Sequence, residues 1–256
     1  MAVIAIVVCL VLLVPAAGAE TIQRDGARVG IEARLLPKAL PREGEAPVRL
    51  ELGLRIGAAP GAELPRLRSI ELRLNRSARL RPAMFPRCRI REIQPSTSQQ
   101  ALAICGDALV GEGRFAAEIL LPEQAPFPSG GRVLAFNGVY RGQPAILAHV
   151  YGIRPAPNAY TLPFVIGRGR AGGTVLRASL PAATTQRGFV RRLRITIGAT
   201  RGRVGEPSGY AIASCPAARG SGSALYPLAQ ASLGFVGSAP MQGTLMRGCS
   251  VAAGGG

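Results

Sequence analysis

Few residues of this 256-residue chain could carry acid–base or nucleophilic chemistry. His149 is the only histidine, and Asp25 and Asp107 are the only aspartates. A Ser-His-Asp triad would need His149 as its base and one of these aspartates to orient it. No GxSxG segment presents a serine nucleophile. The alternation of residues 145–151 places His149 on the strand face opposite Ile146, Ala148 and Val150, so we predict a structural or surface role for it.

The glutamates do not form an obvious catalytic pair either. Glu51 and Glu71 alternate with aliphatic residues, as expected on the solvated face of a strand. Glu112 has the most unusual setting, between two glycines, and we interpret it as part of a β-bulge or turn. With one histidine and two aspartates, a metal centre would depend on glutamate or thiolate ligands, and no nucleotide-binding loop is present. We therefore predict no catalytic residue, no cofactor and no metal.

The cysteines predict disulfides. Cys9 lies in an apolar N-terminal run, which leaves an even number in the rest of the chain: Cys88, Cys105, Cys215 and Cys249. Four cysteines allow three pairings. We favour Cys88 with Cys105 and Cys215 with Cys249, because each pair lies within one stretch of predicted local structure. A zinc site is the alternative, but no CxxC or CxxH spacing supports it.

Residues 1–19 have the features of a signal peptide. They carry no charged side chain, and Val3–Val14 form an apolar run that is too short to span a bilayer as a helix. Ala17-Gly18-Ala19 provides the small residues of a cleavage site, so we expect cleavage before Glu20. We predict a secreted or extracytoplasmic protein that could associate with the cell envelope. An uncleaved N-terminal anchor is the alternative.

The formal charge of +17 is unevenly distributed. Up to Glu123 there are 17 basic and 13 acidic residues, whereas the remainder has 14 basic residues and Glu206 as its one acid, a net charge of +13. This asymmetry predicts a positive potential over the C-terminal half. The candidate anion-binding residues are Arg191, Arg192, Arg194, Arg201 and Arg203. Thirty of the 31 basic residues are arginine, so the coding bias of a high-GC genome is an alternative explanation.

Period-two alternation indicates an all-β fold. In residues 48–56 every second residue is aliphatic, and residues 70–75 and 193–197 repeat the pattern. We predict strands over residues 28–36, 48–56, 67–74, 109–121, 132–136, 145–153, 162–166, 174–180, 190–197, 210–215 and 229–236. Asn137-Gly138 is interpreted as a tight hairpin turn. One short helix is expected near residues 98–105, capped by the hydroxyls before it and ended by Gly106.

Short, half-buried strands at regular spacing favour antiparallel β-sandwiches. The two halves of the chain share a weakly similar order of strands and cysteines. We therefore predict two sandwich-like modules, an N-terminal one over residues 20–155 and an arginine-rich one over residues 156–256. One continuous sandwich is the alternative.

Several stretches resemble an uncharacterised family of secreted β-rich proteins from high-GC Gram-positive bacteria. They are Phe85-Pro86-Arg87-Cys88, residues 100–105, Ala108-Leu109-Val110-Gly111-Glu112-Gly113, Ala135-Phe136-Asn137-Gly138, residues 210–216, residues 229–233 and Cys249. The resemblance spans most of the chain after residue 19. It implies export and both cysteine pairs, and it implies no activity or binding residue.

These observations favour a non-enzymatic envelope or extracellular protein that binds an anionic surface polymer through its C-terminal arginines. Nucleic acid is a poor candidate, because aromatic residues make up 5% of the chain and do not interleave with the arginines. A secreted hydrolase with an atypical site around His149 is one alternative. A structural module that supports a protein partner is another, and the oligomeric state is left open.

Overall fold

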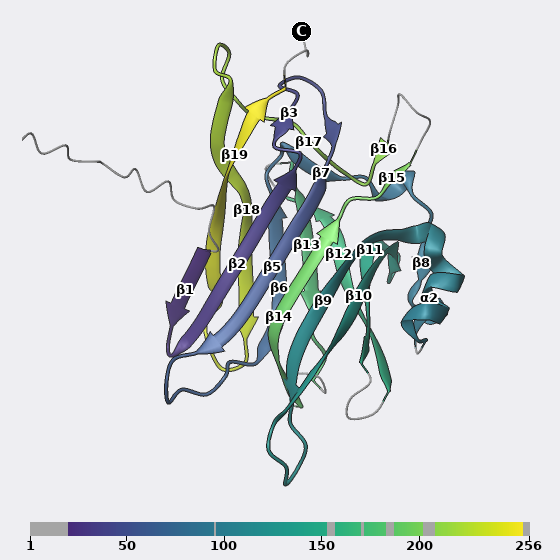
Figure 1. The fold of residues 1–256 in the computed structure, drawn as a ribbon, viewed down its shortest axis with the longest axis vertical. Coiled ribbons are helices and arrows are strands. Elements are labelled where there is room, and N and C mark those ends of the chain that lie inside the picture. Colours follow the sequence, from purple (N-terminus) through teal and green to yellow (C-terminus); the bar gives the residue numbers. More distant parts are fainter. Residues whose placement is uncertain are drawn as a thin grey trace, which may run out of the picture.

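The computed structural model describes residues 20–94, 96–152, 157–169, 172–182, 187–201 and 208–252. The expected signal peptide, residues 1–19, lies outside this part. The described chain is an all-β protein built mainly of antiparallel strands, as the sequence predicts (Figure 1). Among the described residues, no helix has the length and apolar character needed to cross a membrane.

One large sheet contains most of the strands. Its spatial order is β1 (Glu20–Arg24), β2 (Ala27–Leu36), β5 (Arg49–Ala58), β14 (Gly188–Ile197), β9 (Leu109–Ile119), β10 (Phe127–Tyr140), β11 (Gln143–Gly152), β12 (Asn158–Arg168), β13 (Thr174–Ser179), β6 (Leu67–Leu74), β18 (Ser223–Phe235), β19 (Met241–Val251) and β3 (Ala39–Leu40). The short β8 (Cys88–Arg89) pairs with β10 in parallel, and β3 pairs with β19 in the same sense.

The sheet curls so that its two ends approach each other. Strands β1 and β19, from opposite ends of the strand order, lie close together (Figure 1). Alternate residues face the enclosed side, as in β2, where Val29, Ile31 and Ala33 are buried. The two sides of the curled sheet share one apolar core, so the sandwich-like fold is formed by a single sheet.

Smaller elements close the upper end of the molecule in Figure 1. A three-stranded sheet consists of β4 (Ala46–Pro47), β17 (Ala211–Ala213) and β7 (Ala78–Leu80). A second small sheet pairs β15 (Thr200–Arg201) with β16 (Ser208–Gly209).

A helical segment packs on the outer side of β10 and β11. It contains η1 (Pro82–Met84), α1 (Ile90–Ile93), α2 (Ser98–Cys105) and η2 (Gly106–Ala108). The predicted helix near residues 98–105 is confirmed: the Thr97 hydroxyl accepts a hydrogen bond from the Gln100 backbone N–H, and the Gln100 side chain accepts one from the Thr97 N–H. Beneath the segment lies a second apolar cluster that includes Leu134 and Phe136.

The predicted turn at Asn137-Gly138 is wrong, because β10 continues through both residues. The β10–β11 hairpin instead turns at Arg141 and Gly142, which have positive φ angles of 49° and 77°. Asn137 is fully buried, and its amide nitrogen lies 2.9 Å from the Pro86 carbonyl oxygen, to which it donates. A side chain at Gly138 would collide with the Cys88 carbonyl. Tertiary packing therefore explains both residues better than turn formation does.

The two expected modules are not separate bodies. Residues 153–156, where their boundary falls, lie outside the described part, but β11 and β12 on either side pair from Ala145 opposite Val165 to Gly152 opposite Asn158. Strand β14 of the second half lies between β5 and β9 of the first, and β6 of the first half lies between β13 and β18 of the second. The architecture corresponds to the alternative of one continuous fold.

Candidate functional site

The strongest candidate site is a basic surface on the outer side of β5, β14, β9 and β10. We call it the arginine face, defined by Arg55, Arg114, Arg132, Arg192 and Arg194. All five side chains are exposed. Each comes from a strand whose alternate residues face the core, so the same periodicity that builds the core directs these arginines outward.

Strand pairing places the arginines in two rows. Arg132 lies directly opposite Arg114, and Arg114 lies directly opposite Arg194. In the next row Arg192 lies opposite Arg55. Because opposed side chains start about 5 Å apart at Cβ, three guanidinium groups project from adjacent positions across three strands. Like charges in such positions destabilise a sheet, so the row has a cost in the absence of anions.

Two glycines allow the close approach of β14 to β9 that creates the row. A Cβ atom at Gly111 or Gly113 would collide with the backbone carbonyl of Thr196 or Arg194, respectively. Glu112, between them, pairs with Leu134 and Thr196 rather than forming a turn, and the register between β9 and β10 shifts just before it, at Leu109–Gly111, as in a β-bulge. The glycines on either side of Glu112 are therefore explained by the close approach of the β14 backbone to β9.

Acidic neighbours neutralise only part of the arginine face. Glu32 forms ion pairs with Arg55 at 3.4 Å and with Arg194 at 3.7 Å. Glu112 pairs with Arg132 at 2.8 Å. Within the described residues, Arg114 and Arg192 have no ion pair. Five arginines and two glutamates leave this surface with a net charge of +3.

The predicted anion-binding residues are only partly brought together. Arg192 and Arg194 belong to the arginine face, and Arg191 lies beside them in β14 but pairs with Glu118 at 3.4 Å. Arg201 lies in β15, and its side chain is outside the described part of the structure. Arg203 also lies outside the described residues.

Sequence reasoning missed three members of the arginine face. Two of them, Arg55 and Arg114, lie in the part of the chain up to Glu123, which has the lower net charge. The third, Arg132, lies shortly after that boundary. Strand alternation shows that Arg55 points away from its aliphatic neighbours, and this signal was available. It does not show that β5 and β9 both border β14, and net charge by segment selects residues of the C-terminal half alone.

His149 lies in a different, enclosed environment. Its side chain is fully buried in β11, opposite Leu134 of β10 and Thr161 of β12. Within the described residues, neither ring nitrogen has a hydrogen-bond partner, and the buried Thr161 hydroxyl also lacks one. Desolvation lowers the pKa of His149 and favours the neutral ring. No carboxylate in the described part of the chain orients the ring, as a catalytic triad would require.

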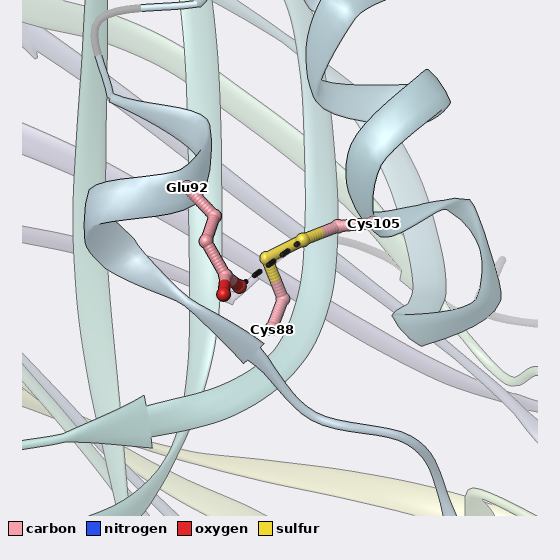
Figure 2. Close-up of side chains that lie close together, drawn as sticks. All are labelled: Cys88, Glu92 and Cys105. Carbon is pink, nitrogen blue, oxygen red and sulfur yellow. Dashed lines mark hydrogen bonds between the residues drawn. A yellow bond between two sulfur atoms is a disulfide. The ribbon is translucent and has the colours of Figure 1, made fainter.

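The cysteines form the two favoured disulfides, Cys88–Cys105 and Cys215–Cys249. Glu92 lies beside the first, with one carboxylate oxygen 3.8 Å from Cys105 Sγ (Figure 2). That oxygen accepts a 2.7 Å hydrogen bond from the Arg89 N–H at the start of α1. Because both sulfur atoms belong to the disulfide, this cluster offers no thiolate to a metal ion, and its role is to connect α1, α2 and β8.

Disulfides are compatible with an extracytoplasmic protein, because they form in oxidising compartments. Comparison of the chain with protein-family models, curated proteins and solved structures finds no match.

Proposed function

We propose that this protein is exported and binds an anionic polymer of the cell envelope through the arginine face, without catalysing a reaction. The observation that carries the proposal is the row of Arg132, Arg114 and Arg194 on three neighbouring strands. A bound polyanion would offset the mutual repulsion that this row imposes on the sheet.

The shape of the arginine face supports a polymer rather than a single small anion. Its two rows extend across four strands, β5, β14, β9 and β10, which are spaced about 4.8 Å apart. All five arginines are exposed side chains of regular strands. An open, repetitive cationic surface suits a chain of repeated phosphate or carboxylate groups.

The proposal is tested by co-sedimentation of the purified protein with isolated cell envelope over a series of salt concentrations. We expect binding at low salt that weakens steeply as salt rises, because exposed charges are screened. The double variant Arg114→Gln/Arg192→Gln removes the two arginines that lack an ion pair. At about 1 kcal/mol for each cation near an anionic surface, it should weaken binding about 30-fold.

The matched control is Arg68→Gln/Arg168→Gln, which makes the same change in net charge on exposed arginines of β6 and β12. This control should bind nearly as well as the wild type. Equal losses in both double variants would show that net charge, rather than the arginine face, controls binding. Undiminished binding by Arg114→Gln/Arg192→Gln would contradict the proposal.

A further inference from the structure

A second surface, separate from the arginine face, has the features of a ligand site. It is a groove of about 860 Å³ between the end of β2 and the paired strands β18 and β19. Its volume lies within the range of about 300–1,000 Å³ that is usual for small-molecule sites. We call it the seam groove, and its wall includes Arg34, Leu36, Lys38, Leu225, Tyr226 and Arg247.

The groove exists because the curled sheet does not close along its whole length. Strand β1 covers β2 only from Ala27 to Ile31. Strand β3 pairs with β19 only at Ser250 and Val251. Between these two short pairings, the edges of β2 and β19 face each other without a joining strand in the described part of the chain.

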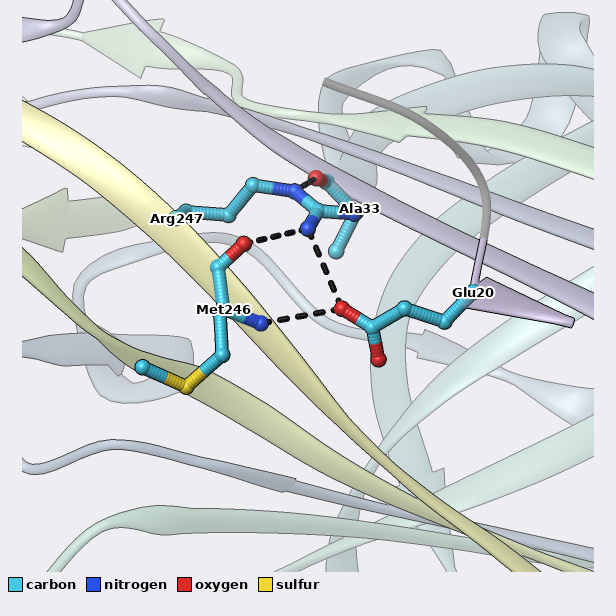
Figure 3. Close-up of polar contacts among 4 residues, drawn as sticks. All are labelled: Glu20, Ala33, Met246 and Arg247. Atoms are coloured by element: carbon cyan, nitrogen blue, oxygen red, sulfur yellow. Dashed lines mark hydrogen bonds and ion pairs between the residues drawn. The ribbon is translucent and has the colours of Figure 1, made fainter. Parts of the chain in front are cut away.

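Arg247 bridges this opening (Figure 3) and also belongs to the wall of the groove. Its guanidinium group donates to the Ala33 carbonyl of β2 and to the Met246 carbonyl of β19, and it forms an ion pair with Glu20 at 3.3 Å. The Glu20 carboxylate also accepts a 3.0 Å hydrogen bond from the Met246 backbone N–H. The charge of Arg247 is therefore matched by that of Glu20, and the role of Arg247 is to hold β2 and β19 together.

Two other cations in the wall are not matched in this way. Arg34 and Lys38 are exposed, and neither forms an ion pair within the described residues. Glu51 also contributes to the wall and lies opposite Arg34 in the strand register, but no ion pair joins the two side chains. The groove thus has an excess of positive charge near the end of β2.

The remaining wall is largely apolar and includes an unusually exposed leucine. Leu225 is 73% exposed, more than any other large hydrophobic side chain among the described residues. It lies on β18 beside Tyr226, whose side chain packs inward, and Leu36 belongs to the same wall. An exposed leucine beside a groove is costly in water and favourable when an apolar ligand covers it.

From this combination we infer that the seam groove binds a single-chain anionic amphiphile, such as a fatty acid or an alkyl phosphate. The acyl chain contacts Leu36 and Leu225, and the head group lies near Lys38 and Arg34. A hydrophilic polyanion would leave Leu225 uncovered. The concave form and the volume of the groove favour one monomeric ligand over contact with a flat membrane surface.

The test uses the purified full chain and isothermal titration with dodecanoate and with dodecyl phosphate, each below its micelle concentration. We expect saturable binding of one molecule of at least one of them, and the better ligand identifies the head group. Dodecanol should bind at least tenfold more weakly, and acetate and inorganic phosphate should not bind detectably. Absence of saturable binding by both amphiphiles would overturn the inference, as would binding only to anionic vesicles.

Three exposed or half-buried positions provide variants with opposite expected signs. Lys38→Gln and Leu225→Gln should each weaken binding about tenfold, whereas Glu51→Gln should strengthen it severalfold by removing a repulsive carboxylate. The control Val236→Gln changes another exposed apolar residue, which follows the opposite end of β18 and does not line the groove, and it should leave the affinity unchanged. Equal affinities in all four variants would refute the assignment. The variant Arg114→Gln/Arg192→Gln should retain amphiphile binding, which separates this inference from the proposed function.

Discussion

His149 is completely buried, and its ring nitrogens have no hydrogen-bond partner among the described residues, which makes it a source of pH-dependent stability. Burial lowers its pKa in the folded protein below the value in the unfolded chain. As the pH falls below about 6.5, the unfolded chain therefore binds a proton that the folded protein does not. The folded state loses stability on acidification.

We expect the free energy of unfolding to decrease between pH 7 and pH 5.5 by up to about 1 kcal/mol per pH unit below the unfolded pKa. Urea-induced unfolding over this range measures the decrease. Because there is no other histidine, His149→Leu should remove most of it. The Glu71 carboxylate acts in the same direction at lower pH: burial opposes its ionisation, but hydrogen bonds from Arg177 and Arg73 outweigh this and lower its pKa. An unchanged slope in His149→Leu would contradict this account.

Among the elements, the helical segment over residues 82–108 has its own apolar cluster and its own disulfide. The Cys88–Cys105 disulfide closes a loop with a sequence separation of 17. A disulfide that closes a loop of this length stabilises the folded protein by about 3 kcal/mol, because it lowers the entropy of the unfolded chain. The arrangement suggests that this segment can open while the curled sheet remains folded.

We therefore expect Cys88→Ser/Cys105→Ser to lose about 3 kcal/mol of stability and to become sensitive to protease between residues 82 and 108. Limited proteolysis with mass spectrometry locates the cuts, and circular dichroism monitors the sheet. Cys215→Ser/Cys249→Ser is the control, because that disulfide joins the loop after β17 to β19 in the main core. Cleavage spread over the whole chain in the first variant would argue against a separate opening unit.

The positions of the strands and helices along the chain could be predicted from the sequence more fully than their contacts with one another in space. Alternation of apolar residues identified most strands, such as β2, and capping residues identified α2, because both signals act over a few residues. The turn at Asn137-Gly138 failed for the opposite reason: the Asn137 amide is held by the carbonyls of Pro82, Phe85 and Pro86, far away in the sequence. A pattern of a few consecutive residues cannot predict such long-range contacts.

The arginine face shows the same limit at the candidate site. Alternation predicts that Arg114 and Arg194 point away from the core. Their proximity depends on the pairing of β9 with β14, which lie about 80 positions apart in the chain. The composition of a segment cannot reveal that pairing, and so a site shared by four strands was assigned to one half of the chain.

At the scale of the whole molecule, the core contains a small unfilled cavity. A cavity of about 90 Å³, lined almost wholly by apolar side chains, lies between the two sides of the curled sheet and includes Ala148 and Ala231 in its wall. At about 24 cal/mol per Å³, a void of this size costs about 2 kcal/mol. It is smaller than the apolar cavities of about 150 Å³ that accept a benzene molecule, so it is better explained as incomplete packing.

Ala148→Val should partly fill the cavity and raise the free energy of unfolding by about 1 kcal/mol. Ala135→Val is the matched control, because Ala135 is fully buried in the same core but does not line the cavity. Overpacking at that position should lower stability by about 1–3 kcal/mol. Thermal or urea-induced unfolding distinguishes the two variants, and a loss of stability in both would mean that the cavity cannot accept added methyl groups.

The position of β14 between β5 and β9 also determines how the chain can acquire its structure over time. Its two neighbours leave the ribosome long before it does, and neither can complete its hydrogen bonds until residues 188–197 arrive. Such distant pairings make folding slow, and open strand edges promote aggregation during the delay. A chain that ends at residue 155 would remain permanently at this vulnerable stage.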